Sequence, residues 1–185
     1  MSLFEFIMVL LSIIIGLGIA EILSGFAQAL LHRRLTVGSW HQLLLSCIVF
    51  VTLIQVWWES WRLHDVPEWN FPQLLMFLLN PVLLYTLAHL LFPDSTSSVP
   101  LRAHYFENHR LLYSVVAVTA LASLAFQPIV FRTSLFAIHN LSTLLMLSGS
   151  LVLATSRRPA LHSVLLPVGV LLSAFDIVAG VFSIS

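Results

Sequence analysis

Four titratable residues lie inside segments that are otherwise apolar enough to span a lipid bilayer. They are Glu21, His89, His139 and Asp176. A charge in hydrocarbon is costly, so such residues usually face a protein interior or a water-filled path. A carboxylate and an imidazole at similar depth can share a proton near neutral pH, and we expect Glu21 and His89 to form such a pair. The alternative is a neutral, hydrogen-bonded glutamic acid that lines a polar pocket.

Polar and small residues recur at helical spacing along the predicted helices. The predicted seams are Gly18, Glu21, Gly25 and Gln28; Thr52, Gln55, Glu59 and Arg62; His139, Ser142, Thr143, Met146 and Ser150; and Gly169, Ser173, Asp176, Gly180 and Ser183. Residues three, four and seven apart share one face of a helix. The seams are either packing surfaces between helices or the walls of a polar path. For an ion or proton path we predict Glu21, His89, His139, Asp176, Tyr85 and Gln55.

A second group of polar residues lies just before the fourth predicted span. It comprises Arg102, His104, Tyr105, His109 and Arg110. Arginine presents a fork of donors that matches phosphate oxygens, so this group could bind a lipid headgroup. It could also simply anchor the following helix among the headgroups.

Other site chemistry receives little support. The eight histidines include no HExxH or HxxxH spacing on a span, and we predict no metal and no cofactor. The chain has no lysine and no GxSxG sequence, so lysine chemistry is excluded and no enzyme motif is recognisable. The formal net charge is zero, which gives no basic tract for nucleic acid.

Apolar runs define the elements that must position these residues. The chain has 185 residues, of which 59% are hydrophobic and only 9% charged. A membrane-spanning helix needs about 20 mostly apolar residues. We therefore predict one all-α transmembrane domain over residues 1–185, a bundle of six helices. The predicted spans are 4–30, 42–61, 71–92, 110–127, 133–155 and 162–184. The first run lacks the basic start of a signal peptide, so we expect a retained helix.

Arginine placement predicts the orientation of the bundle. Six arginines follow the first, third and fifth spans, and two lie on the opposite side: Arg33, Arg34, Arg102, Arg110, Arg157 and Arg158 against Arg62 and Arg132. The richer side is expected in the cytoplasm, which places both termini outside. A weak internal echo, between 79–83 and 165–168, allows a second reading as two inverted three-helix halves.

Several short stretches resemble a known group of proteins. They are Phe4-Glu5-Phe6, Gly16-Leu17-Gly18-Ile19-Ala20-Glu21, Leu91-Phe92-Pro93, and Ala103-His104-Tyr105-Phe106 with Asn108 and Arg110. With these, the chain resembles small multipass membrane proteins of proteobacteria over about two-thirds of its length. The resemblance implies a bacterial inner (plasma) membrane, with both termini then periplasmic, and brings no activity with it.

The sequence therefore leaves three functional hypotheses open. The leading one is a proton or small-ion channel or carrier that uses the intramembrane acids and histidines. The second is a non-catalytic scaffold or sensor that binds a partner protein, and the third is a lipid-binding protein. Because so short a chain leaves almost no mass outside the bilayer, we also expect a homo-oligomer, a dimer being the simplest.

Overall fold

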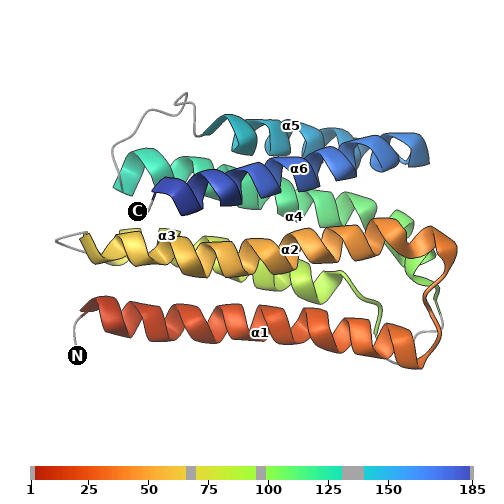
Figure 1. Ribbon diagram of the computed structural model, residues 1–185, viewed down its shortest axis with the longest axis horizontal. Helices are drawn as coiled ribbons and strands as arrows, with labels where there is room; N and C mark the ends of the chain where they lie inside the picture. Colours follow the sequence, from red (N-terminus) through yellow and green to blue (C-terminus); the bar gives the residue numbers. More distant parts are fainter. Residues whose placement is uncertain (1–2, 66–69, 95–98, 131–139, 184–185) are drawn as a thin grey trace.

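The chain folds into a bundle of helices (Figure 1). The computed structural model describes residues 3–65, 70–94, 99–130 and 140–183, and this part contains no β-strand. Its α-helices are α1 (Leu3–Leu31), α2 (Trp40–Glu59), α3 (Phe71–Leu90), α4 (Leu101–Val130), α5 (Leu141–Thr155) and α6 (Pro159–Ser183); η1 (Val37–Ser39) and η2 (Ser60–Asp65) are short 3-10 helices. The predicted six-helix, all-α bundle is confirmed.

Five of the helices are long and apolar enough to cross a membrane: α1, α2, α3, α4 and α6. The described part of α5 is apolar but has 15 residues, which span about 22 Å against a hydrocarbon core of about 30 Å. The first residues of the predicted fifth span, 133–139, lie outside the described residues. The helices indicate an integral, multipass membrane protein.

The helices pack around one another as one bundle. α1 packs on α2 and α3, α4 packs on α3 and α5, and α6 packs on α2 and α5. α2 also contacts α3 and α4. In Figure 1, α2 and α3 accordingly lie between α1 on one side and α5 on the other.

α1 and α3 run parallel and in register, because two glycines let them approach closely. A Cβ at Gly18 would lie 3.0 Å from the Leu53 side chain and 3.6 Å from the Tyr85 Cα. Two turns along, a Cβ at Gly25 would overlap the ring of Phe92, just after α3. From the Gly18–Tyr85 contact to the Gly25–Phe92 contact the chain advances by seven residues on both sides. Residues of α1 and of the α3 segment between these contacts therefore lie at matching levels along the bundle.

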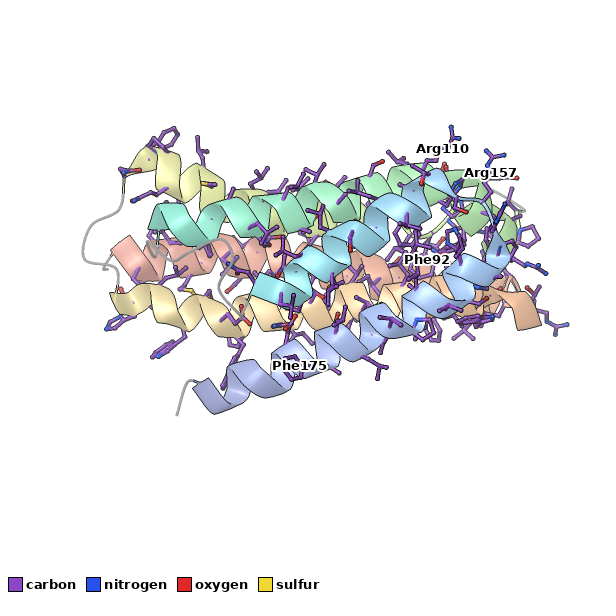
Figure 2. The ribbon with its side chains drawn as sticks, turned by 90° about the horizontal axis from the view of Figure 1, so that it is seen from above. Phe92, Arg110, Arg157 and Phe175 are labelled. Carbon is purple, nitrogen blue, oxygen red and sulfur yellow. The ribbon has the colours of Figure 1, made fainter. Side chains whose placement is uncertain are left out.

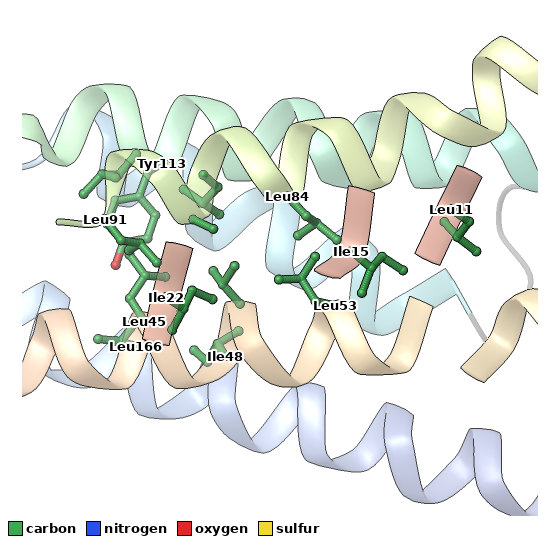
Figure 3. Close-up of a cluster of buried hydrophobic side chains, with 14 of the residues drawn as sticks. Leu11, Ile15, Ile22, Leu45, Ile48, Leu53, Leu84, Leu91, Tyr113 and Leu166 are labelled. Carbon is green, nitrogen blue, oxygen red and sulfur yellow. The ribbon is translucent and has the colours of Figure 1, made fainter. Parts of the chain in front are cut away.

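A continuous apolar core joins these helices (Figure 3). α1 is apolar on all sides, and one stripe at helical spacing, Ile7, Leu11, Ile15 and Ile22, faces inward. The buried members that Figure 3 labels are Leu11, Ile15, Ile22, Leu45, Ile48, Leu53, Leu84, Leu91, Tyr113 and Leu166. The opposite face of α1 exposes large apolar side chains such as Phe6, Ile13 and Leu17, which suits contact with lipid.

Local sequence sets where the helices begin and end. Asn70 caps α3: its Oδ1 accepts from the Gln73 backbone N–H at 2.9 Å, while the Gln73 side chain accepts from the Asn70 N–H at 3.2 Å. Two residues after the end of α1, Arg33 adopts a left-handed backbone conformation with φ of 50°. The Arg34 N–H then reaches back to the Ala29 carbonyl at 2.9 Å, which satisfies one of the last carbonyls of the helix.

α4 begins nine residues earlier than predicted. Residues 101–110 were expected in a long loop, yet they form its first turns, directly after Pro100. Leu101, Tyr105 and His109 are buried on one face, whereas Glu107 and Arg110 are exposed on another. This amphipathic segment is too polar to span a membrane, but it forms a helix because its apolar face packs on the bundle.

Six arginines gather at one end of the bundle. Arg33 and Arg34 follow α1, Arg102 and Arg110 lie early in α4, and Arg157 and Arg158 precede α6. Figure 2 shows Arg110 and Arg157 at this end and Phe175 well away from it. We call it the arginine end. The backbone of Arg62 lies in η2 at the opposite end, and Arg132 is outside the described residues.

Candidate functional site

Glu21 and His89 meet where α1 and α3 pack. His89 Nδ1 lies 3.4 Å from Glu21 Oε2, which confirms the predicted contact. The register of α1 and α3 produces it, because the pair sits between the Gly18 and Gly25 crossings. Glu21 lies 10 residues before the end of α1, so its Cα is about 15 Å along the axis from that end.

The pair is not sealed inside the bundle. The Glu21 side chain is 38% exposed and the His89 side chain 61% exposed, on the outer surface of α1 and α3. Polar groups at membrane depth on an isolated chain need cover from protein, lipid headgroup or water. The surface around Glu21 and His89 is therefore one that the folded monomer leaves incomplete.

An open groove of about 200 Å³ begins at His89. Its lining residues come from the end of α3, the extended segment after it and the start of α4: His89, Leu90, Phe92, Pro93, Asp94, His104, Asn108 and Leu111. Its volume is below the range of about 300–1,000 Å³ typical of drug-sized ligands, but is ample for several waters or a small ion with its shell. The groove exists because α3 stops at Leu90 while α1 continues toward the arginine end.

Hydrogen bonds within the groove wall use up its donors. His104 Nε2 contacts the Leu90 carbonyl at 3.1 Å and therefore donates to it. The Asn108 amide nitrogen donates to the His104 carbonyl at 3.0 Å and approaches His104 Nδ1 at 3.2 Å. The backbone carbonyl fixes which end of the Asn108 amide is nitrogen. The other polar groups of the wall are the Asn108 oxygen, the His89 ring and Asp94, whose backbone carbonyl accepts from Arg34 Nη1 at 3.2 Å, so acidic and basic residues meet beside the groove.

The other residues predicted for a path lie in separate places. Tyr85 is half-buried one turn before His89. Gln55 donates to Glu59 Oε1 at 2.8 Å along one face of α2. Asp176 of α6 lies close to the Ser142 side chain of α5. His139 lies outside the described residues.

The contacts of α1 separate Glu21 from Asp176. α1 packs on α2 and α3, whereas Asp176 lies between α6 and α5. The described side chains thus do not bring the two acids to one shared interior. The sequence had suggested that they would line a common path.

The residues expected at lipid headgroups divide into two sets. Arg102 and Arg110 are exposed, and His104 is half-buried in the groove wall. Tyr105 and His109, in contrast, are completely buried and face the interior between α4, α2 and α6. Their place on the buried face of α4 corrects the expectation for these two residues, because a side chain closed off by neighbouring helices cannot reach a lipid.

Tyr105 is the centre of a buried polar network. Its hydroxyl lies 2.6 Å from the Tyr113 hydroxyl and 2.8 Å from His162 Nδ1. His162 Nε2 lies 2.8 Å from the Ser156 carbonyl. His41 stacks against Tyr105, with ring centroids 5.6 Å apart, and its Nε2 meets Ser163 Oγ at 3.0 Å.

The network has a direction. A carbonyl only accepts, so the single N–H of a neutral His162 imidazole is on Nε2 and donates to Ser156. His162 Nδ1 then accepts a hydrogen bond from the Tyr105 hydroxyl. Because Tyr105 has used its only hydroxyl proton in this bond, its oxygen accepts from the Tyr113 hydroxyl. Tyr113 thus donates to Tyr105, Tyr105 donates to His162, and these bonds link α4 to the start of α6.

The sequence gives partial signals for this network. Tyr105, His109 and Tyr113 are spaced by four residues, which places them on one face of a helix. His162 and His41 stand beside other polar residues, Ser163 and Gln42, and nothing in their spacing indicates that they are buried. Among the described residues, no group of three histidine, cysteine or acidic side chains is arranged to hold a metal ion.

Comparison of the chain with protein-family models, with curated proteins and with solved structures finds no match. The function must therefore be argued from the residues themselves.

Proposed function

We propose that the protein carries protons, or a small cation, across its membrane, with Glu21 as the charge-bearing residue and His89 as its partner. The observation that supports this most is the double position of His89. It contacts the Glu21 carboxylate at 3.4 Å and also forms part of the groove wall. An ion in the groove would need to pass only one imidazole to reach an acid inside the membrane.

The groove wall offers groups that can accept a proton. It includes the His89 imidazole, the Asn108 oxygen and Asp94, whose backbone carbonyl accepts from Arg34 Nη1 at 3.2 Å. An imidazole that can gain or lose a proton near neutral pH is suited to pass it to a carboxylate. Glu21 would hold the proton as a neutral acid, which lipid tolerates much better than an anion.

The exposure of Glu21 and His89 supports a dimer. In a second copy the same surface would be available, and a two-fold contact could cover both polar pairs at once. Under this proposal Asp176, which lies close to Ser142 of α5, does not take part in the proton transfer between His89 and Glu21. A bacterial inner membrane, with the arginine end in the cytoplasm and both termini periplasmic, completes the proposal.

Proton flux into liposomes that contain the purified protein tests the proposal. A potassium gradient with valinomycin supplies the driving force, and a trapped pH-sensitive dye reports the flux. We expect Glu21→Gln to abolish flux, since an amide cannot take up the proton. Glu5→Gln is the matched control, because it is the same change at the far end of the same helix, and it should leave flux unchanged.

Four outcomes would contradict the proposal or one part of it. Wild-type liposomes that acidify no faster than empty ones would rule out proton transport, and the same assay with a sodium or potassium indicator would then decide on a small cation. Equal flux in Glu21→Gln would remove Glu21 from the path. Loss of flux in Asp176→Asn, with the dimer intact, would show that the second acid belongs to it. A folded protein with no flux of any ion would favour the scaffold hypothesis.

The exposed arginines support lipid-headgroup contact as a second candidate. Arg102 and Arg110 are exposed at the arginine end, and the Arg102 side chain lies over Gly38 in η1. Guanidinium groups at this level are placed to contact lipid phosphates. Lipid co-purified with Arg102→Gln/Arg110→Gln, measured by mass spectrometry, should contain less anionic lipid than the wild type; an unchanged lipid profile would refute it.

A further inference from the structure

Two completely buried side chains at the arginine end have polar atoms without a protein partner. Both amide atoms of Gln42, and Nε2 of His109, make no hydrogen bond among the described residues. Both side chains have 0% exposure. A buried polar group without a partner costs about 1–3 kcal/mol in proteins, so the identity of the missing partners matters.

His109 needs a donor. Its Nδ1 lies 2.8 Å from the Phe106 carbonyl and therefore donates to it. The neutral ring then presents the lone pair of Nε2 to the interior. His162, whose ring centroid is 5.9 Å away, cannot supply this donor, because its own N–H is directed at Ser156.

Gln42 needs a donor and an acceptor at once. Its carbonyl oxygen accepts and its NH₂ group donates, and both ends are buried. The Ser46 hydroxyl donates to the Gln42 backbone carbonyl at 2.8 Å, and His41 Nε2 pairs with Ser163, while His41 Nδ1 also makes no hydrogen bond among the described residues. Whatever completes Gln42 must be small and must both donate and accept.

We propose that Gln42 and His109 bind internal water, so that the core between α2, α4 and α6 is hydrated at the arginine end. Water is the guest that donates and accepts in the smallest volume, and buried water characteristically makes about three hydrogen bonds to otherwise unsatisfied groups. The Tyr113–Tyr105–His162 network lies beside His109 and shares this core. The site is separate from Glu21 and His89, which lie on the outer surface of α1 and α3, and it does not depend on the proposed transport.

Radiolytic hydroxyl-radical labelling of the whole folded protein in nanodiscs tests the proposal, because radicals formed from bound water label the side chains beside it. Phe77 is the reference, since it is buried in the apolar core. After correction for intrinsic reactivity, we expect Tyr105, His109 and Tyr113 to be labelled faster than Phe77, because bound water would lie beside them. Equal rates would overturn the proposal.

Two variants assign the water to its ligand. Gln42→Leu fills a similar volume without polar atoms and should lower the labelling of His41, the adjacent residue on α2, toward that of Phe77. Gln28→Leu is the control, because Gln28 lies on α1 and bonds to Ser24 at 3.4 Å, and it should change nothing. A folded Gln42→Leu protein with undiminished labelling would remove Gln42 from the site. If that variant does not fold, the wild-type comparison with Phe77 still decides.

Discussion

Adding one methyl group to α1 tests the register that creates the Glu21–His89 contact. Alanine at Gly25 would place a Cβ inside the ring of Phe92 and 2.9 Å from the Phe92 Cβ. Rotation of the Phe92 ring does not move the Phe92 Cβ, so it cannot relieve the contact between this atom and the new alanine Cβ. The segment after α3 must therefore move away from α1. Alanine at Gly16, nine residues earlier, would meet no atom within 4 Å among the described residues.

The difference between these two variants isolates the overlap. Alanine is preferred over glycine in a helix by roughly 0.5–1 kcal/mol, and this term is common to both sites. Overpacking costs about 1–3 kcal/mol. We therefore expect Gly16→Ala to raise the free energy of unfolding slightly, and Gly25→Ala to fall about 1–3 kcal/mol below Gly16→Ala.

Reversible unfolding in mixed micelles, followed by tryptophan fluorescence, measures both variants against the wild type. Phe92 also lines the groove, so Gly25→Ala should slow proton entry while Gly16→Ala leaves it unchanged. Equal stabilities of the two variants would refute the close approach of α1 to the end of α3, and with it the placing of Glu21 beside His89.

Two further predictions concern interhelical hydrogen bonds. Tyr105→Phe removes the partner of both Tyr113 and His162 and should lower the free energy of unfolding by about 2–5 kcal/mol. Tyr113→Phe removes one donor and should lower it by about 0.5–1.5 kcal/mol. Thermal unfolding that ranks the two variants in the opposite order would contradict the assigned direction of the network. Asn80 donates to Ser123 at 2.7 Å between α3 and α4. A double-mutant cycle of Asn80→Ala and Ser123→Ala should give a coupling of about 0.6 kcal/mol, and a coupling indistinguishable from zero would show that this bond does not hold the helices together.

Apolar length predicted the fold, because a membrane-spanning helix has to satisfy its own backbone. The ends of α1, α2 and α3 fall within two residues of the predicted spans. The start of α4 could not be found in this way. Its first turns are amphipathic, and a search for uninterrupted apolar residues rejects Arg102, Glu107 and Arg110 even though a buried face runs through them.

The sequence predicted the Glu21–His89 contact because both residues interrupt apolar runs at similar depth. It could not predict that the pair would be exposed, since depth says nothing about which face of a helix meets a neighbour. The same gap explains Tyr105 and His109. Their spacing shows that they share a face of α4, but only the packing of α2 and α6 shows that this face is covered.

The uneven distribution of polarity favours a carrier over an open channel within the proposed function. From the arginine end, the groove brings polar atoms as far as His89 and Glu21. Beyond them, toward the start of α1, the described core between α1, α2 and α3 is apolar and buried, as Leu11, Ile15 and Leu53 in Figure 3 illustrate. A continuous water path would require these side chains to separate. A proton held on a neutral Glu21 could instead cross this layer by a movement of α1 against its neighbours, and such a movement would have to separate the close contact of Gly18 with Leu53.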